Sequence, residues 1–582
     1  MRDATALAES LERHLGDPND PDHRFSFARS AELDRSELFP GDACRLLTDW
    51  GMQHQYVPAW LGGELTDFQA PVRLIRAVAR RDLTVAIAHG KTFLGGVCAW
   101  LVEPTSRVKA LARDVLAGHP VSWALTERDH GSDLLATEVR AAPVPGGYHI
   151  TGEKWLINNA TRGRYVTVLT RTHPDGGSRG FDVLLVDKEE LSSSAYECLP
   201  AVRLHGIRGA DISGITFHAA HVDDDCLLGE PGKGLETVLH SLQLTRTLCA
   251  GLSLGAGDHA LALAMRFAAE RTLYGRRLLD LPQARRTLLD AYADHLLSEA
   301  LVLVGTRAIH DRTEEMSVIS AVVKYLVPWR TDATLDALGQ LLGARSQLVA
   351  DFADGQFQKL HRDHRIVAIF DGNSLVNLHA LVNQFPILAR KARAQLEAPA
   401  TPEAAERLAP DPAAAPFDPT RLSLVAQHGS SLLGSLPTSV RALADLAAHQ
   451  PSLAPVAGLA HRVLERTHAV VAEMTGHRPS RHQVAAETFL VAEEFALCCA
   501  AAAALELWIA HQPGTTGTPS DPLWQDAHWL HATLRRVLEA LAVSCPPSPQ
   551  VDEALFDALT RQTGEGWSTS LLPQRTAEGI SR

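Results

Sequence analysis

The spacing of apolar residues changes twice along the chain, and these changes predict its domains. From residue 1 to about 120, apolar side chains recur at helical spacing, as at Val72, Ile75 and Val78. From 121 to about 232 the pattern becomes short alternating runs separated by Gly, Pro and Asp, which is typical of β-strands. We expect a helical N-terminal domain followed by a small antiparallel barrel or sandwich.

Helical spacing returns after the β-rich segment. Long apolar-patterned stretches within 233–396 predict a helical bundle. The segment 397–420 is rich in Pro and Ala, as linkers are, and 421–582 is again helical and rich in Ala and Leu. The predicted fold class is therefore mostly α with a central β-domain, followed by an additional C-terminal helical domain.

Composition excludes several classes of protein. With 582 residues, 46% hydrophobic and 21% charged, the chain is expected to be a multidomain globular protein. The formal charge is −13 and no lysine follows Lys391, so a basic face for nucleic acid is not expected.

The cysteines and the chain ends bear on the compartment. Eight cysteines, including the adjacent Cys498 and Cys499, have neither the density of a disulfide framework nor Cys-x-x-Cys spacing, which indicates buried thiols in a reducing compartment. Residues 1–20 lack the apolar core of a signal peptide, and the apolar stretch Phe495–Leu505 is shorter than the roughly 20 residues of a membrane span. We expect a cytoplasmic protein without a membrane span and with a buried helix at Phe495–Leu505.

The segment WALTERDHGSD carries the most specific motif. Thr126, Gly131 and Ser132 offer small and hydroxyl groups whose backbone and side chains can approach a flat polar ring. The segment resembles the Thr-Glu-Pro-x-x-Gly-Ser-Asp signature of the acyl-CoA dehydrogenase family, with Arg128 in place of proline. The resemblance implies that Thr126 and Gly131 contact FAD and that Ser132 lies near both flavin and substrate; the alternative is a helix cap and turn.

The resemblance covers roughly residues 50–395 and includes further motifs. VPAWLGGELTDF is similar to the family's entry loop, and GEKWLINNA resembles the strand behind the flavin ring. In that strand Leu156 stands at a position often aromatic and Asn158 at the usual Thr or Ser, and both are implied to bind the cofactor. A purely structural strand with a buried Trp155 is the alternative.

Two motifs in the bundle resemble the part of the family that binds the rest of FAD. AERTLYGRRL resembles Arg-x-x-Phe-Gly through Arg271 and Tyr274, and GQLLGAR resembles Gln-x-x-Gly-Gly through Gln340 and Gly343. In that family the arginine comes from a neighbouring subunit and pairs with the FAD pyrophosphate, a use that suits a guanidinium. The alternative for Arg271 is a solvated surface charge. No G-x-G-x-x-G follows an evident strand, and GEPGKG lacks P-loop spacing.

The segment KLHRDHRIVAIFDGNS resembles the family's Arg-Asp-x-Arg-Ile followed by Tyr-Glu-Gly-Thr, and it places Asp371 where the general base is expected. Abstraction of an α-proton requires an ionised carboxylate that faces one side of the thioester with the flavin on the other. Aspartate is shorter than glutamate by about 1.5 Å, and such a displacement can cost on the order of 100-fold in rate. The alternative is a turn residue before Gly372, because Asp-Gly is a frequent turn pair.

The same resemblance assigns the remaining site residues. It implies that Asn373 contacts the cofactor. It implies that the substrate contacts, besides Ser132, are Gln243, Arg246, Phe370 and Gly372. Another branch of the family carries its base immediately before this arginine, where the present chain has Thr245.

Other charged residues near these motifs are expected to be structural. We expect Glu127 to support the signature loop, and we expect Asp363 to pair with the flanking Arg362 and Arg365. His361 and His364 are three residues apart but have no third ligand in the sequence, so no metal site is predicted.

Three functions remain open at this point. The first is α,β-dehydrogenation of an acyl thioester, carried by CoA or by an acyl-carrier protein, with FAD as hydride acceptor, an electron-transferring flavoprotein as re-oxidant, and a homodimer or homotetramer as the assembly. The second is a flavin oxidase or N-hydroxylase of the same superfamily, because its nitroalkane-oxidising branch uses aspartate as base. The third is a DNA-binding flavoprotein of the alkylation-response type, which also carries an extra C-terminal domain but would need a basic face. Very-long-chain members carry such a domain too, and without a basic amphipathic helix we expect it to serve subunit packing rather than lipid binding.

Overall fold

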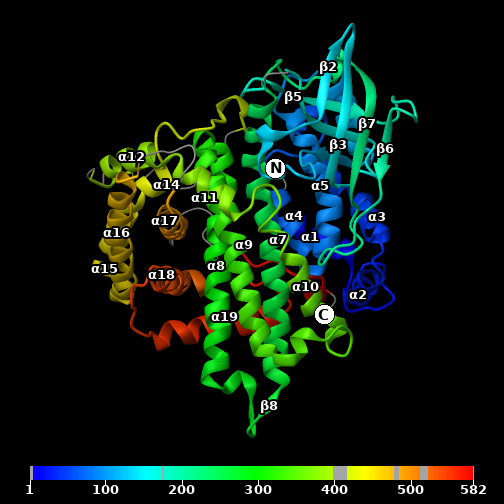
Figure 1. The fold of residues 1–582 in the computed structure, drawn as a ribbon. Coiled ribbons are helices and arrows are strands. Elements are labelled where there is room, and N and C mark those ends of the chain that lie inside the picture. Colours follow the sequence, from blue (N-terminus) through cyan, green and yellow to red (C-terminus); the bar gives the residue numbers. More distant parts are fainter. Residues whose placement is uncertain (1–3, 174–175, 398–415, 478–483, 512–521, 581–582) are drawn as a thin grey trace. The chain divides into compact units, whose positions relative to one another are not determined.

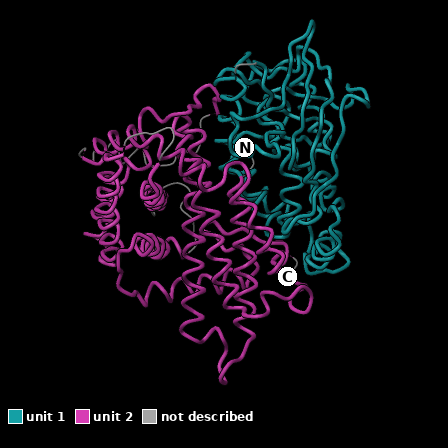
Figure 2. Tube along the Cα trace, in the orientation of Figure 1, with its two compact units in different colours: residues 1–248 teal, residues 249–582 magenta. Residues whose placement is uncertain are grey.

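The computed structural model describes residues 4–173, 176–397, 416–477, 484–511 and 522–580. The chain forms two compact units, residues 1–248 and residues 249–582 (Figure 2). Helices come first, a curled β-sheet follows, and helices form the rest of the described chain (Figure 1). The predicted fold class is therefore confirmed, including helices beyond residue 421. Most of the linker predicted at 397–420 lies outside the described residues.

The first unit begins with helices that bury apolar stripes. Their bounds are α1 (Ala4–Leu15), α2 (Phe27–Ser36), α3 (Gly41–Trp50), α4 (Gln69–Arg81), α5 (Leu83–Trp100) and α6 (Ser106–Leu116). Helix α4 ends and α5 begins at Asp82. The side chain of Asp82 accepts the backbone N–H of Thr84 at 2.7 Å. This is an N-cap, which satisfies a backbone donor that the start of a helix leaves open.

The β-sheet of the first unit curls around its own apolar core. Its strands are β1 (Val121–Ala124), β2 (Arg140–Val144), β3 (Gly147–Asn158), β4 (Tyr165–Arg171), β5 (Phe181–Asp187), β6 (Tyr196–Leu199) and β7 (Ile212–Asp223). The order is β1-β4-β2-β3-β7-β6, and β5 pairs with β4. β2, β3, β7 and β6 form antiparallel pairs as expected, but β1 runs parallel to β4, so the sheet is mixed rather than antiparallel throughout. A parallel neighbour requires a long connection, and residues 125–164 supply it.

Helix α5 packs directly on β1 and β4 of this sheet. Thr167 of β4 donates its hydroxyl to the carbonyl of Gly95 at 2.6 Å, and Asn159 donates its side-chain amide to the carbonyl of Ala88 at 3.0 Å. A Cβ on Gly95 would lie 2.6 Å from the carbonyl oxygen of Val121, so only glycine allows this close approach. The helix is thereby fixed against the strands that carry the signature loop.

Where the structure describes it, the second unit consists mainly of helices and contains a two-stranded hairpin. The long helix α7 (Gly234–Glu270) contributes its residues from 249 onward. The next elements are β8 (Thr272–Leu273), β9 (Arg276–Arg277), α8 (Pro282–Asp311), α9 (Met316–Leu342), α10 (Gln356–His364), α11 (Ser374–Val382) and α12 (Phe385–Glu397). The C-terminal helices are α14 (Ser431–Gly434), α15 (Leu436–His449), α16 (Ala454–Thr475), α17 (Ala486–Ala510), α18 (His528–Ala540), α19 (Pro549–Gly564) and α20 (Ala577–Ile580).

Helix α17 is longer than the apolar stretch from which it was predicted. The stretch Phe495–Leu505 is buried as predicted, but it belongs to a helix of 25 residues, so its length does not exclude a membrane span. Among the described helices, α7 and α17 are long and apolar enough to cross a membrane by length and composition alone. In their most apolar stretches, 94% and 67% of the residues are buried inside the protein, which is also the pattern of a core helix.

The C-terminal helices pack on the bundle of their own unit. Helices α17, α18 and α19 contact α8, and α16 contacts α12. Tyr292 of α8 donates its hydroxyl to Gln562 of α19 at 2.8 Å, and the buried Glu299 accepts the backbone N–H of Leu571 at 2.7 Å. These buried polar contacts join segments about 270 residues apart in the sequence.

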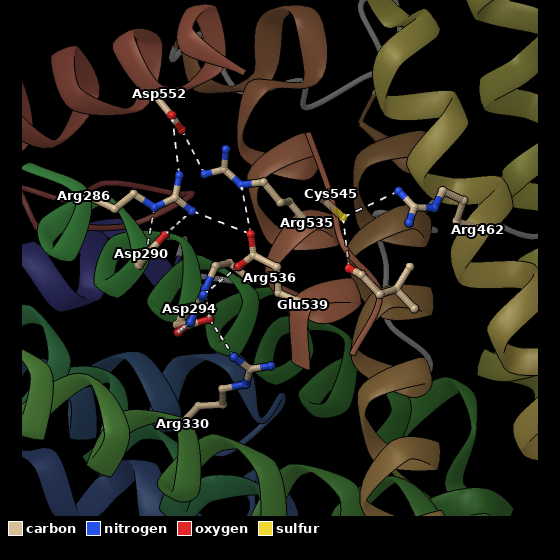
Figure 3. Close-up of polar contacts among 11 residues, drawn as sticks. Arg286, Asp290, Asp294, Arg330, Arg462, Arg535, Arg536, Glu539, Cys545 and Asp552 are labelled. Carbon is tan, nitrogen blue, oxygen red and sulfur yellow. Dashed lines mark hydrogen bonds and ion pairs between the residues drawn. The ribbon is translucent and has the colours of Figure 1, made fainter. Parts of the chain in front are cut away.

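A network of charges also joins the bundle helices α8 and α9 to the C-terminal helices α18 and α19 (Figure 3). Its members alternate in sign and are Arg286, Asp290 and Asp294 of α8, Arg330 of α9, Arg535, Arg536 and Glu539 of α18, and Asp552 of α19. Asp294 lies at its centre and accepts from Arg330 at 2.8 Å and from two nitrogens of Arg536 at 2.8 and 3.1 Å. Four positive charges face four negative ones, so the network is balanced, as partly buried charges must be.

Candidate active site

The signature loop is held by a buried ion pair. The fully buried Lys154 of β3 donates from Nζ to Glu127 at 2.8 Å and to the carbonyl of Leu125 at 2.9 Å. The same carboxylate accepts the backbone N–H groups of Glu138 and Val139 at 2.8 and 3.1 Å. Burial lowers the pKa of Lys154 to about 8, while the charge of Glu127 opposes this shift. Glu127 therefore has a structural role, as its sequence context predicts.

The other face of this loop is open. Ser132 is exposed, and a Cβ on Gly131 would meet no atom within 4 Å. The carbonyl of Thr126 accepts the backbone N–H of Trp155 at 3.0 Å, which ties the loop to β3. Arg128, the departure from the family's proline, places its guanidinium 4.6 Å from the centre of the Trp155 ring. The bulky residue at this position thus contacts two side chains of β3, Trp155 and Glu153.

Strand β3 contains a bulge at Leu156. Trp155 pairs with Gly214 and Ile157 pairs with Ser213, so Leu156 has no partner across the ladder. Its φ of +59° is left-handed, a conformation that leucine rarely adopts, and its side chain is 42% exposed. A bulge redirects a side chain, and bulges are frequent next to functional sites. The position that the resemblance assigns to the cofactor is therefore one of the two irregular points of this strand.

Asn158, two residues further along β3, has an unusual side chain. Both its amide nitrogen and its amide oxygen are buried, and neither has a hydrogen-bond partner among the described residues. Buried polar atoms without partners are rare and destabilising, so this amide needs a partner that the described residues do not supply, either a bound water or a cofactor. A flavin ring presents both donor and acceptor atoms along one edge, which fits a side chain that can donate and accept.

Helix α7 contributes Gln243, Thr245 and Arg246 to the first unit. Their exposed fractions are 3%, 0% and 8%, so none of them is a solvated surface residue. Thr245 is neutral and its buried hydroxyl has no partner among the described residues. The position used for a base in another branch of the family therefore carries no carboxylate here.

The residues expected at the far end of FAD lie at one end of the bundle in the second unit. Arg271 precedes the β8–β9 hairpin, and Tyr274 at its tip is 94% exposed with a φ of +55°. Gln340 and Gly343 end helix α9, and both are exposed. The Arg345 guanidinium lies 5.5 Å from the centre of the Phe267 ring, which places the end of α9 beside the end of α7.

Asp371 lies in the turn between α10 and α11 of the second unit. Its φ is +56° and that of Gly372 is +97°, so two consecutive residues are left-handed. Aspartate and glycine tolerate this geometry better than most residues, and the turn interpretation of the sequence is correct as far as the backbone is concerned. The carboxylate is partly buried, and its Oδ2 accepts the thiol of Cys249 at 3.4 Å.

The residues next to Asp371 in the sequence lie in the same turn or at the start of α11. Phe370 and Gly372 are partly buried, and Asn373 caps α11 by accepting the backbone N–H of Val376 at 2.9 Å. Asn373 therefore has a structural role whether or not it also contacts a cofactor.

Charged residues of α10 have partners that the sequence did not indicate. Asp363 pairs with Lys359 at 2.6 Å, whereas Arg365 pairs with Asp336 at 2.8 Å. The partner of Asp363 that the sequence did not indicate thus lies one helical turn away on the same helix. The histidines of α10 are also engaged, since His361 contacts Asp336 at 2.8 Å.

Three site residues were missed by sequence reasoning, namely Lys154, Lys324 and Cys249. Lys154 and Lys324 are both fully buried, and only Lys324 has a signal in the sequence, because it interrupts the apolar run VVKYLV. Cys249 has no such signal, because a cysteine in a helical apolar run has the pattern of an ordinary core residue. Within the described residues, no three His, Cys, Asp or Glu side chains are grouped in a way that could hold a metal.

Comparisons with known proteins match two segments of this chain to domains of one enzyme family. The model of the acyl-CoA dehydrogenase C-terminal domain matches residues 232–384, and that of the acyl-CoA dehydrogenase middle domain matches residues 122–220. The probable acyl-CoA dehydrogenase FadE25 of Mycobacterium tuberculosis is 27% identical over 351 residues, which are 60% of this chain and 88% of that protein.

Solved structures share the fold. Butyryl-CoA dehydrogenase from Megasphaera elsdenii matches with a TM-score of 0.56 and 20% identity over 65% of this chain and 96% of that one. The prolyl acyl carrier protein oxidase AnaB matches with a TM-score of 0.59 and 16% identity over 65% of this chain and 97% of that one. Over residues 122–220 and 232–384 the chain is therefore similar to acyl-CoA dehydrogenases, and this similarity indicates an FAD-dependent oxidoreductase.

Proposed function

We propose that this protein removes two hydrogens from the α and β carbons of an acyl thioester, with Asp371 as the base that takes the α-proton. The observation that carries the proposal is the Asp371 carboxylate, which is presented on a left-handed turn and accepts the thiol of Cys249. It follows helix α10 in a bundle that matches the acyl-CoA dehydrogenase C-terminal domain. The matching relatives support flavin-dependent acyl thioester dehydrogenation in general.

The chain's own residues have distinct tasks in this reaction. Asp371 takes a proton, and it must be ionised to do so. Asn158, Leu156, Thr126 and Gly131 would hold the flavin ring on the β-domain. FAD, when bound, supplies the hydride acceptor. Thr245 is neutral, so it leaves the proton transfer to the carboxylate in the bundle.

The substrate is proposed as an acyl thioester whose carrier is CoA or an acyl-carrier protein. Both carriers present the same reacting end, and the proteins that share the fold include enzymes named for each of them. Ser132, Gln243, Arg246, Phe370 and Gly372 are the proposed substrate contacts. We further propose that the protein is cytoplasmic and that an electron-transferring flavoprotein re-oxidises it.

We propose a homodimer or homotetramer in which Arg271 reaches the cofactor of a second copy. Lys324 contacts the turn that carries Asp371, and Gln340 lies sixteen positions further along α9. The end of α9 that carries Gln340 is therefore about 24 Å from the proposed base, measured along the helix axis. The exposed hairpin with Tyr274 at its tip lies at the Gln340 end of the bundle. An exposed aromatic tip beside arginines is suited to contact another chain rather than water.

A second candidate is oxidation of a nitroalkane. It is favoured by the identity of Asp371 itself, since the nitroalkane-oxidising branch of the superfamily uses aspartate. Proton abstraction next to a nitro group makes the same demand on the carboxylate as abstraction next to a thioester.

Anaerobic bleaching of the bound flavin separates these functions. The purified protein is mixed with butyryl-, octanoyl- and palmitoyl-CoA, with the same acyl groups on acyl-carrier protein, and with nitroethane. Loss of the yellow absorbance with at least one acyl thioester, and none with nitroethane, is the expected result. Bleaching by nitroethane alone would support the second candidate, and a folded protein that takes up no FAD would contradict both.

A further inference from the structure

The turn that carries Asp371 is irregular and strained. Residues 365–372 belong to no regular helix, and Asp371 and Gly372 both have positive φ. A non-glycine residue in the left-handed region costs on the order of 1 kcal/mol or more, and it persists only where its surroundings hold it. The contacts that hold this turn therefore determine where the carboxylate of Asp371 points.

A single buried lysine joins the two ends of this turn. Lys324 of α9 is 1% exposed, and its Nζ donates to the carbonyl of Val367 at 2.8 Å and to the carbonyl of Gly372 at 3.1 Å. The two carbonyls are five residues apart, and Asp371 lies between them. The same Nζ lies 5.4 Å from the centre of the Phe370 ring. One side chain thus spans the segment on both sides of the proposed base.

Asn377 completes the attachment from α11. Its side-chain amide donates to the carbonyl of Gly372 at 2.9 Å and to the carbonyl of Asn373 at 2.9 Å. The carbonyl of Gly372, the residue after Asp371, therefore accepts two hydrogen bonds. One comes from Lys324 and the other from the fully buried Asn377. Two donors on one carbonyl fix the peptide plane between Gly372 and Asn373.

A buried lysine lowers the stability of the folded protein, so its presence behind this turn needs a reason. Burying an ammonium group costs several kcal/mol, which hydrogen bonds to carbonyls only partly offset. An apolar side chain of the same length would fill the space but would leave the carbonyls of Val367 and Gly372 without this donor.

We propose that Lys324 is a positioning residue for the reaction: it clamps the turn at Val367 and Gly372 and so aims the Asp371 carboxylate at the α-carbon of the substrate. This inference rests on the proposed function, because it requires Asp371 to be the base. Lys324 itself transfers no proton, and it acts only through the backbone on either side of Asp371.

The test is the rate of anaerobic flavin reduction in Lys324→Met, Lys324→Gln and Lys324→Arg. The substrate is the acyl thioester that bleaches the wild-type protein most rapidly. In Lys324→Met, we expect the rate at saturating substrate to fall on the order of 100-fold, as a misplaced catalytic group predicts, while the half-saturating substrate concentration changes by less than about 3-fold. Lys324→Arg retains the charge and the donors and should recover at least about a tenth of the wild-type rate.

Lys359→Met is the matched control. Lys359 is also a buried lysine of the bundle, but it pairs with Asp363 on its own helix. Its loss should lower the melting temperature and leave the reduction rate of the FAD-loaded protein unchanged. If Lys324→Met does not fold, Lys324→Gln, which keeps a donor but no charge, gives the same comparison against Lys324→Arg.

Asp371→Asn, measured in parallel, distinguishes failure of this inference from failure of the proposed function. If Asp371→Asn is inactive while the Lys324 variants reduce flavin at the wild-type rate, the clamp is refuted and the base assignment stands. If Asp371→Asn reduces flavin normally, the proposed base is refuted, and with it the role of Lys324. A selective loss of the saturated rate in Lys324→Met, with recovery in Lys324→Arg, supports the proposal.

Discussion

Cys249 of α7 donates its thiol to the carboxylate of Asp371, with 3.4 Å between Sγ and Oδ2. Cys249 is 5% exposed, so this contact shields one side of the carboxylate from water. The thiol is a weak donor, but its hydrogen bond fixes the direction of the carboxylate oxygen that accepts it. The side chain of Asp371 is therefore held by Cys249 of α7, and its backbone is held by the contacts of the turn.

Replacement of Cys249 should change the rate of flavin reduction, because the thiol fixes the direction of the Asp371 carboxylate. In Cys249→Ala the donor is lost, so the rate at saturating substrate should fall by about 10-fold. In Cys249→Ser a stronger donor remains, and the rate should stay within about 2-fold of the wild-type rate. Stopped-flow flavin reduction measures both, and equal rates in the three proteins would show that the thiol has no influence on the base.

Glu127→Gln should weaken the signature loop. The substitution leaves the ammonium of Lys154 buried without its charged partner, and breaking a buried pair in this way costs about 3–5 kcal/mol. We expect a lower melting temperature, faster amide exchange in residues 125–139, and weaker FAD retention during gel filtration. As a control, Glu153→Gln removes only the partly exposed partner of Arg128 and should alter stability by less than about 1 kcal/mol.

Asp294→Asn should loosen the attachment of the C-terminal helices. Asp294 balances Arg330 and Arg536, and Arg330 is 4% exposed, so an uncompensated charge would remain buried. We expect a loss of about 3–5 kcal/mol and earlier proteolytic release of fragments that contain α18 and α19. The partly exposed pair of Arg307 and Asp311 on the same helix provides the control, because Asp311→Asn should cost at most about 0.5 kcal/mol.

His531 should make the C-terminal helices sensitive to acid. Burial, and then the nearby charge of Arg535, lower the pKa of His531 from its usual 6.5 to about 4 in the folded protein. The unfolded chain binds a proton below pH 6.5 and the folded chain does so only near pH 4, so stability falls as pH falls through this interval, by up to about 3 kcal/mol. His531→Gln should flatten the fall of melting temperature between pH 6.5 and 4, whereas replacement of the exposed His449 by Gln should not.

Much of the fold follows from periodicity. The alternating runs became β3, β4, β5 and β7, and the apolar stripe at Val72, Ile75 and Val78 became the buried face of α4. The parallel pairing of β1 with β4 could not be predicted, because alternation shows which face is buried but not which strand is the neighbour.

The candidate site was predicted by motif and only partly by geometry. The motif located Asp371, but neither its left-handed φ nor the contact with Lys324 has a local signal, since Lys324 lies 47 positions earlier in the sequence. The bulge at Leu156 and the unpaired amide of Asn158 are likewise properties of the folded strand. Local sequence specifies where such residues occur, and long-range contacts specify what surrounds them.

The most direct measurement of the central claim is anaerobic flavin reduction by an acyl thioester in Asp371→Asn. The variant should fold, retain FAD and keep its yellow absorbance, because asparagine also tolerates the left-handed turn. The proposed mechanism predicts that bleaching falls by at least about 1000-fold, because an amide cannot take the α-proton. Bleaching at the wild-type rate would show that Asp371 is not the base.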